Sequence, residues 1–426
     1  MSRMNRTMMF VCLLFLAPWQ AMAYPIDGSV ETGIMRLEGY RQAQLGHVPG
    51  NRLSAGARLA SDQIRLRMQE HDRVQLPAAN QKLTKEIIRL LGDEADDYSI
   101  SVLDLSDPDH PVYAAHNDDV IRNPASVGKL VIMLSLFQSL ADIYPDNIPA
   151  REKVLRESMI VADAFIHKDH HRVPFWVPAD MRLQKRKLVE GDVANYWSYL
   201  DWMLSASSNA AASMVLKHVM LLRHYGAAYP VGRAAERAYF EQTSRKQLSS
   251  ALKLALREPL LQNRLDPERF RQGGFFSRFG KQRVPGTTSI MTTRELMHFC
   301  LLMEQGQLVD GWSSLQMKRL IYLTQRRIRY ASSAALKGAA VYFKSGSYYK
   351  CKPEAGFVCK PYMGNKLNLM NSVAIIEAPA AAPEMHYIVT VTSNVLRKNS
   401  ALVQQRLATD LHQLMQGLHG THAAPQ

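Results

Sequence analysis

The sequence predicts a mixed α/β (α+β) fold in which one β-sheet is built from strands near both ends of the chain. Residues Tyr98–Leu105 alternate as a strand does, and three further strand patterns lie between residues 340 and 393. The chain between them is mainly helical in pattern, above all between about residues 127 and 220. Helices must cover the apolar faces of such a sheet, so we expect them to pack on it.

The first 23 residues have the pattern of a secretory signal peptide. Arg3 and Arg6 precede an apolar run from Met8 to Ala17, and Ala21–Ala23 offers small residues for cleavage. Tyr24, and not a cysteine, stands directly after this point, so we expect no lipid anchor. No later stretch comes close to the roughly 20 uncharged apolar residues of a membrane helix. We therefore expect export, with a periplasmic or secreted location.

The next part of the chain divides at about residue 80. Residues 24–79 contain no chemical motif, and we expect an N-terminal extension that packs on the main domain at 80–416. That domain opens with a helix at 82–91, followed by strands at 98–105 and 112–116 that are joined by a turn with two prolines.

The remaining elements follow from the same patterns. A polar, histidine-bearing stretch at 167–174 interrupts the helical region and is expected to be a surface loop. The other expected elements are helices at 233–257, 293–305, 313–324 and 400–416, a glycine- and phenylalanine-rich loop at 273–288, strands at 340–344, 371–377 and 386–393, and a disordered tail at 417–426.

The charge of the chain favours anionic surroundings. The formal net charge is +14, or +12 without the two arginines of the signal. Cell-wall polymers and anionic lipid surfaces both suit such a protein. Nucleic acid is not an expected partner, because the protein is exported and no basic stretch is interleaved with aromatics. We expect a monomer.

No cofactor or metal is expected. The sequence has no glycine-rich phosphate loop and no dinucleotide-binding motif. His167, His170 and His171 lack supporting cysteines and a clear acidic partner at helical spacing, so they do not predict a zinc site.

Three cysteines follow the signal. Cys351 and Cys359 lie eight residues apart across a turn-like segment, and in an oxidising compartment they are candidates for a disulfide. Two free thiols remain the alternative. Cys300 lies in an apolar helical run and is expected to be a small buried side chain.

Three short motifs suggest chemistry. They are Ser126-x-x-Lys129, Ser207-Ser-Asn209 and Lys344-Ser-Gly346, in that order. Each alone is a weak signal, but Ser126 directly precedes a long apolar helix pattern. Backbone N–H groups at a helix N-terminus stabilise developing negative charge. Three-residue spacing places Lys129 on the same helix face, where a desolvated lysine can act as a base.

This motif set resembles that of class A β-lactamases and penicillin-binding proteins, whose pattern is S-x-x-K, S-D-N and K-T-G. The resemblance extends over roughly residues 80–416, and Thr292–Phe299 resembles the segment that opens a late helix in this family. Two positions depart from it, because Ser208 replaces the usual aspartate and Ser345 the usual threonine. The resemblance implies an antiparallel sheet and a largely helical second lobe.

The resemblance also implies roles for single residues. Ser126 would attack the substrate carbonyl, Lys129 would help to take its proton, and Ser207 would relay a proton to the leaving nitrogen. Asn209 would hold the substrate amide. Lys344 and Ser345 would bind the substrate carboxylate. The backbone N–H groups of Ser126 and Ser347 would form an oxyanion hole, and Gly346 would keep the strand open to the ligand.

The glutamate that activates water in class A β-lactamases has no clear counterpart. The family motif E-P-x-L-N is absent, although the segment Arg257–Asn263 resembles it with one extra residue. Glu258 is therefore the candidate base for deacylation. Glu241 is the alternative, since its distance from the second motif is closer to the family's usual spacing. Both could instead be solvated helix residues.

The leading functional hypothesis is hydrolysis of β-lactams through an acyl-enzyme on Ser126. The nearest alternative is a D-alanyl-D-alanine carboxypeptidase that acts on peptidoglycan stem peptides. A third is a module that is acylated and scarcely turns over, and a fourth is a structural wall-associated protein with a relic site.

Overall fold

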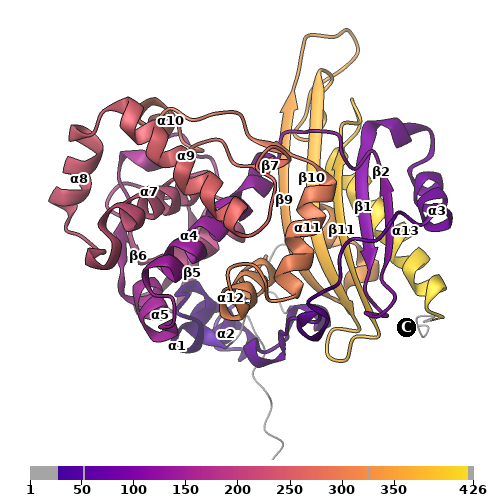
Figure 1. The fold of residues 1–426 in the computed structure, drawn as a ribbon, viewed down its shortest axis with the longest axis horizontal. Coiled ribbons are helices and arrows are strands. Elements are labelled where there is room, and N and C mark those ends of the chain that lie inside the picture. Colours follow the sequence, from indigo (N-terminus) through magenta and orange to yellow (C-terminus); the bar gives the residue numbers. More distant parts are fainter. Residues whose placement is uncertain (1–26, 51–52, 325–326, 421–426) are drawn as a thin grey trace, which may run out of the picture.

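The computed structural model describes residues 27–50, 53–324 and 327–420 of the 426-residue chain. The predicted signal peptide lies outside these residues. A five-stranded antiparallel sheet in the order β2-β1-β11-β10-β9 forms one half of the molecule (Figure 1). Its strands are β1 (Tyr98–Asp104), β2 (Val112–His116), β9 (Ala340–Lys350), β10 (Leu367–Ala378) and β11 (Met385–Ser393). The predicted fold class is therefore confirmed.

Helices cover both faces of the sheet. On one face α3 (Gln81–Leu91) and α13 (Ser400–Leu418) pack over the strands, and on the other lie α11 (Thr293–Glu304) and α12 (Gly311–Tyr322). Helix α3 shows how the sequence specifies this packing. Its buried residues Leu83, Ile87 and Leu91 recur every four positions and so form one apolar stripe.

The second half of the molecule is a helical lobe around α4 (Lys129–Ile143). This helix is apolar on nearly all sides and packs against α6 (Tyr196–Leu204), α7 (Asn209–Tyr225) and α9 (Arg245–Gln262). Residues 125–143 are long and apolar enough to cross a membrane, contrary to the expectation from sequence. The segment is 72% buried inside the protein, as expected of a core helix.

Three helical or irregular stretches differ from the prediction. The helix expected at 233–257 is two helices, α8 (Arg233–Gln242) and α9, because Ser244 caps the second one with a capping box that includes Gln247. The expected loop at 273–288 contains the short helix α10 (Arg278–Arg283). Helix α13 continues to Leu418, and His419 Nε2 lies 2.7 Å from Asp104 Oδ2, so the expected tail begins later than predicted.

Short strand pairs within the lobe were not predicted. They are only two to five residues long, too short to show a clear alternation, and pairing rather than local pattern stabilises them. The pairs are β3 (Met159–Val161) with β6 (Val193–Asn195), β4 (Val173–Val177) with β5 (Arg182–Arg186), and β7 (Phe270–Arg271) with β8 (Ile290–Met291).

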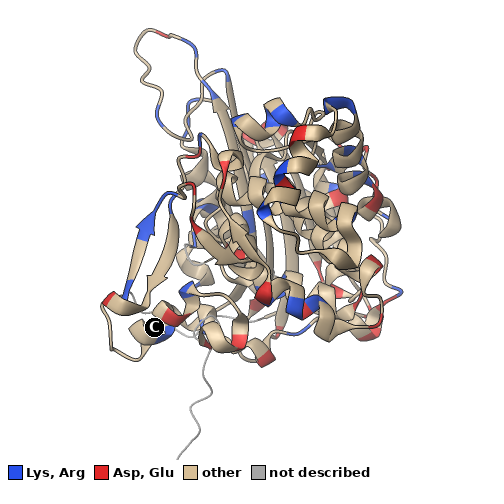
Figure 2. Ribbon diagram, turned by 90° about the vertical axis from the view of Figure 1, so that its left-hand side faces the viewer, with Lys and Arg blue, Asp and Glu red and all other residues tan. Residues whose placement is uncertain are grey.

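The cysteines lie as the disulfide hypothesis required. Cys351 and Cys359 are joined, so the alternative of two free thiols does not hold. This disulfide lies in the long β9–β10 connection, which projects from the sheet and carries the exposed residues Lys352, Lys360 and Lys366 (Figure 2). Cys300 is buried in α11, where desolvation raises the pKa of its thiol.

Residues 27–79 contribute directly to the core of the helical lobe. Helices α1 (Gly28–Thr32) and α2 (Arg36–Gln44) lie against it, and Leu37 and Met68 are fully buried. Arg36 is also buried and forms a bidentate ion pair with Asp201 of α6. This pair joins the N-terminal segment to the lobe.

Replacement of Asp201 by alanine should therefore lower the free energy of unfolding by about 3–5 kcal/mol, because the Arg36 guanidinium would stay buried without its carboxylate. Urea denaturation measures this change. Glu38→Ala is the matched control, since it removes the more exposed pair with Arg41 on the same helix and should cost about 1 kcal/mol or less. Equal losses in the two variants would contradict the role of the buried pair.

Candidate active site

Ser126 lies in a tight turn, η5 (Ala125–Gly128), that leads into α4. The turn begins with Ala125 at a φ of 47°, and its N–H donates to Asn123 Oδ1 at 2.9 Å. Strand β9 passes directly beside this turn. A Cβ atom on Gly346 would lie 2.6 Å from both Pro124 O and Ser126 N, so only glycine permits the approach.

Lys129 is fully buried one turn after Ser126, and its amine binds three groups at once. Nζ lies 2.9 Å from Ser126 Oγ, 2.6 Å from Ser207 O and 2.8 Å from Asn209 Oδ1. The ring of Phe276 covers it at 4.6 Å. The structure thus brings the first and second sequence motifs together.

The buried position of Lys129 makes it a candidate base. Desolvation lowers the pKa of its amine to about 7, although the charge of Asp169 partly opposes this shift and that of Arg329 adds to it. At neutral pH a large fraction is therefore uncharged, and a neutral amine can accept the proton of the Ser126 hydroxyl at 2.9 Å.

Ser207 lies between two lysines. Its Oγ accepts a hydrogen bond from Lys344 Nζ at 2.9 Å and is 3.4 Å from Lys129 Nζ. Its φ of 56° is in the left-handed region, which a serine adopts only under constraint from its surroundings. Proton relay between the lysines and a leaving group is chemically feasible at this position.

The third motif lies on β9, an edge strand of the sheet. Lys344 is buried, and desolvation together with the nearby charges of Lys129 and Arg329 holds its pKa well below the usual range. Arg329, which the sequence analysis missed, donates to Ser345 Oγ at 2.8 Å and to Ser347 Oγ at 3.2 Å. No motif marks this arginine, because it reaches β9 from a loop.

A cavity of about 600 Å³ opens over Ser126. Its volume suits a small molecule or the end of a peptide. Its lining combines the first motif with the β9 edge and a loop after α9. The lining residues are Asn123, Ala125, Ser126, Asn209, Gln272, Gly274, Phe275, Phe276, Lys281, Gly286, Thr287, Thr288, Ser289, Ser347 and Tyr348.

Glu258 does not reach this cavity, which corrects the sequence-based assignment. Its side chain is 43% exposed and pairs with Arg223, whose guanidinium also lies 4.0 Å from Asp142 at the far end of α4. The 15 residues of α4 span about 22 Å, so Glu258 and Ser126 lie at opposite ends of that helix. The local resemblance to the family motif did not reflect its position in space.

Glu241 is also remote. It is an exposed residue of α8 that lines a different cavity, of about 280 Å³, together with Lys217 and Arg233. Among the described residues that line the cavity at Ser126 there is no carboxylate. Gln272 instead lies against the turn that contains Ser126. A Cβ atom on Gly128 would lie only 2.2 Å from Gln272 Oε1. A carboxamide cannot act as a general base at neutral pH.

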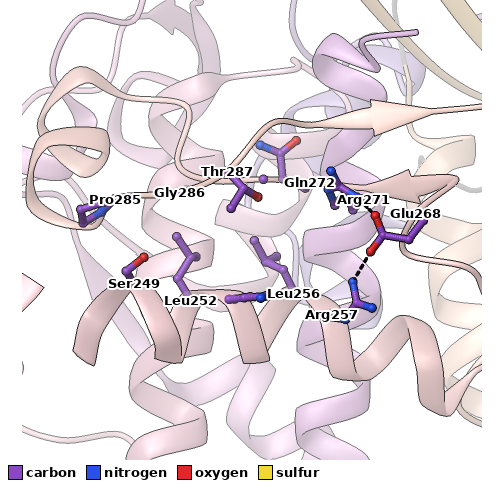
Figure 3. A pocket seen from close by; sticks show the side chains of 12 residues that line it. Ser249, Leu252, Leu256, Arg257, Glu268, Arg271, Gln272, Pro285, Gly286 and Thr287 are labelled. Atoms are coloured by element: carbon purple, nitrogen blue, oxygen red, sulfur yellow. Dashed lines mark hydrogen bonds and ion pairs between the residues drawn. The ribbon is translucent and has the colours of Figure 1, made fainter. Parts of the chain in front are cut away.

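The loop that contains Gln272 separates two cavities. Its outer side faces α9 across a cavity of about 220 Å³ (Figure 3). Gln272, Gly286 and Thr287 line both this cavity and the one at Ser126. Arg257 and Arg271 are held there by Glu268, at 2.6 and 2.7 Å. The loop that contains Gln272 is therefore the wall between the candidate active site and the cavity beside α9.

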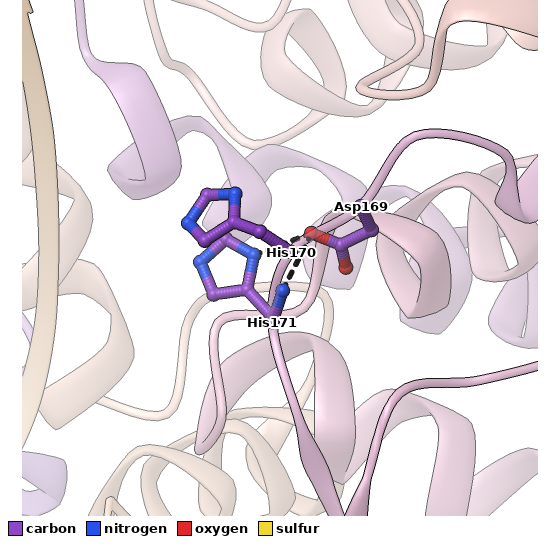
Figure 4. A group of neighbouring side chains, drawn as sticks. All are labelled: Asp169, His170 and His171. Carbon is purple, nitrogen blue, oxygen red and sulfur yellow. Dashed lines mark hydrogen bonds and ion pairs between the residues drawn. The ribbon is translucent and has the colours of Figure 1, made fainter.

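The histidine-bearing stretch is only partly a surface loop. His170 is exposed, but the side chain of Asp169 is only 6% exposed and binds His171 (Figure 4). Asp169 Oδ1 accepts from His171 N and lies 2.6 Å from His171 Nδ1. Oδ2 accepts from Ser208 Oγ and Ala210 N. Both oxygens are thus engaged within the protein, and the ligand atoms of Asp169, His170 and His171 lie within 4.8 Å of one another.

No protein-family model and no curated protein sequence matches the chain. A β-lactamase from Sphaerobacter thermophilus matches its structure with a TM-score of 0.51 at 14% identity, over 80% of this chain and 99% of that one. A variant of PBP-A, solved as an acyl-enzyme complex with penicillin-G, matches with a TM-score of 0.49 at 12% identity, over 81% of this chain and 100% of that one. A class A β-lactamase from Bacteroides cellulosilyticus matches with a TM-score of 0.47 at 13% identity, over 82% and 100%.

The low pKa of Lys129 predicts a pH dependence for the reactivity of Ser126. The neutral amine is the form that accepts a proton, so reaction with a serine-directed acylating reagent should rise with pH through a midpoint of about 7 and then level off. The rate of Lys129→Ala should not show this rise with pH, and the variant should react about 10²–10⁴-fold more slowly. Labelling rates between pH 5 and 9 measure both effects, and a flat profile for the unmutated protein would exclude Lys129 as the base.

Proposed function

We propose that this chain, which has the β-lactamase/transpeptidase-like fold, is a serine hydrolase that is acylated on Ser126 by β-lactams or peptidoglycan stem peptides. The observation that supports this most directly is the hydrogen-bonded array of Lys129 with Ser126, Ser207 and Asn209. This array supports the assignment of a nucleophile, a base and a relay hydroxyl beside one cavity.

The proposed reaction has two stages. Ser126 Oγ bonds to the substrate carbonyl carbon, and its proton passes to Lys129 Nζ. The carbon–nitrogen bond then breaks, and the leaving nitrogen takes that proton by way of Ser207. In the second stage water cleaves the ester, which releases an acid and restores the Ser126 hydroxyl.

The charges around the cavity support a substrate with a carboxylate. Lys344 and Arg329 lie behind Ser345 and Ser347, and no acidic side chain is among the described lining residues of the cavity. A buried guanidinium such as that of Arg329 favours an anionic group beside these hydroxyls. Both β-lactams and stem peptides bear such a group.

Release of the acyl group is proposed to be slow. A fast second stage needs a base for the attacking water, and neither Glu258 nor Glu241 lies at Ser126. This favours the peptidase or the slowly releasing module over an efficient β-lactamase. Efficient β-lactam hydrolysis remains the second candidate, because the pKa of about 7 allows Lys129 itself to activate water.

We also propose that the protein is exported to the periplasm or beyond the cell. The composition of the first 23 residues supports this, and so does the disulfide between Cys351 and Cys359, since disulfides persist in oxidising compartments.

Incubation with a chromogenic cephalosporin, followed by intact mass measurement, tests the proposed function. We expect one stoichiometric adduct that decays slowly, and no adduct on Ser126→Ala. Steady turnover by the parent enzyme would favour the β-lactamase. If the parent enzyme gives neither adduct nor turnover, the proposal is wrong.

Arg329→Ala should lower the second-order acylation rate for a penicillin by about 10- to 100-fold, the range expected for a lost charge-assisted hydrogen bond. It should change the rate much less for the methyl ester of the same penicillin, which has no carboxylate. Arg327→Ala is the matched control, because Arg327 contacts backbone carbonyls of Leu336 and Ala339 instead of β9 hydroxyls. Equal decreases in the acylation rate for the penicillin and its methyl ester would show that Arg329 does not bind the carboxylate.

A further inference from the structure

The segment between α5 (Ile148–Glu157) and α6 reaches the second motif through one side chain. Asp169 Oδ2 accepts hydrogen bonds from Ser208 Oγ at 2.8 Å and from Ala210 N at 2.9 Å. Its other oxygen is held by His171, so the carboxylate is fixed from both sides. Asp169 does not line the cavity at Ser126 and is not placed to touch a substrate there.

These bonds act on the first turn of α7. The first N–H groups of a helix have no partner within the helix, and a carboxylate at this end also interacts favourably with the helix dipole. Ser208 caps α7 by accepting from Ala211 N, while its own hydroxyl proton is donated to Asp169. Asp169 therefore determines both the orientation of this cap and the bonding of Ala210 N.

The residues on either side of Ser208 are the functional ones. Ser207 has a strained backbone with a φ of 56°, and Lys129 fixes its carbonyl from one side. Asp169 fixes the adjoining residues 208 and 210 from the other side. Asn209 Oδ1 accepts a hydrogen bond from Lys129 Nζ, and the position of Asn209 depends on the same turn.

We propose that Asp169 supplies, from a distant segment, the carboxylate that the second motif lacks at Ser208, and that it thereby positions Ser207 and Asn209 for acylation. This inference rests on the proposed function and deepens it. Asp169 is a positioning residue, and His171 holds it in place.

The charge of Asp169 gives a second consequence. It raises the pKa of Lys129 against the effect of burial. The other charged or titratable groups that face this region are His170 and His171 on the same segment, Lys344 on β9, and Arg329. Loss of the carboxylate therefore removes the negative charge that favours the protonated amine, so the neutral form is favoured at lower pH.

Asp169→Asn tests the proposal, because an amide offers one acceptor oxygen where the carboxylate offers two. Acylation of the full chain by a penicillin should slow about tenfold, with the acid limb of its pH profile moved to lower pH. In the double variant Asp169→Asn with Ser208→Asp, a carboxylate returns to the second motif itself and should restore most of the rate. Asp192→Asn is the matched control, since Asp192 lies on the same segment but pairs with Arg186.

Hydrogen–deuterium exchange across residues 207–213 gives a readout that needs no activity. Exchange there should be faster in Asp169→Asn than in the parent or in Asp192→Asn, and slower again in the double variant. The positioning role is wrong if Asp169→Asn exchanges at the same rate as the parent. It is also wrong if the parent is acylated and Asp169→Asn has the same acylation rate and pH profile. A parent that is never acylated would refute the proposed function, while exchange would still decide whether Asp169 holds the turn.

Discussion

The candidate active site depends on one buried amine. Lys129 Nζ lies where the turn that contains Ser126, the second motif and the ring of Phe276 meet. It forms hydrogen bonds with Ser126, Ser207 and Asn209. Burial of a lysine costs free energy unless its donors are paired, and here its polar partners are the functional side chains themselves. The same burial lowers its pKa toward neutrality, so the structural constraint and the chemical property have one cause.

Much of this architecture could be predicted from the sequence because local pattern specified it. Strands β1 and β2 and helix α3 begin and end within about one residue of their predicted bounds, since alternation and four-residue spacing are strong there. The three motifs also met as expected, because each follows or precedes a strongly apolar element that fixes its place. Ser126 before α4 is the clearest case.

The errors have a common physical reason, which is that sequence separation does not give distance in space. Glu258 was chosen from a local resemblance, yet α9 places it beside Arg223 at the far end of the lobe. Asp169 and Arg329 were missed because each reaches the site from a loop, where no periodic pattern reports its direction. The histidine-bearing stretch was predicted to be a surface loop because it is polar, yet Asp169 within it bonds to the second motif.

The order of strands in the sheet has a consequence for how the chain folds. Strand β1 pairs with β11 through Tyr98 and Ser393, which lie far apart in the sequence. Closing such a long loop has an entropic cost, and contacts of high sequence separation form slowly. The chain can therefore form α4 and its helical neighbours well before the sheet is complete. Lys344 reaches Ser207, and Gly346 reaches the turn at Ser126, only when β9 is in place, so this site acquires its full surroundings late in folding.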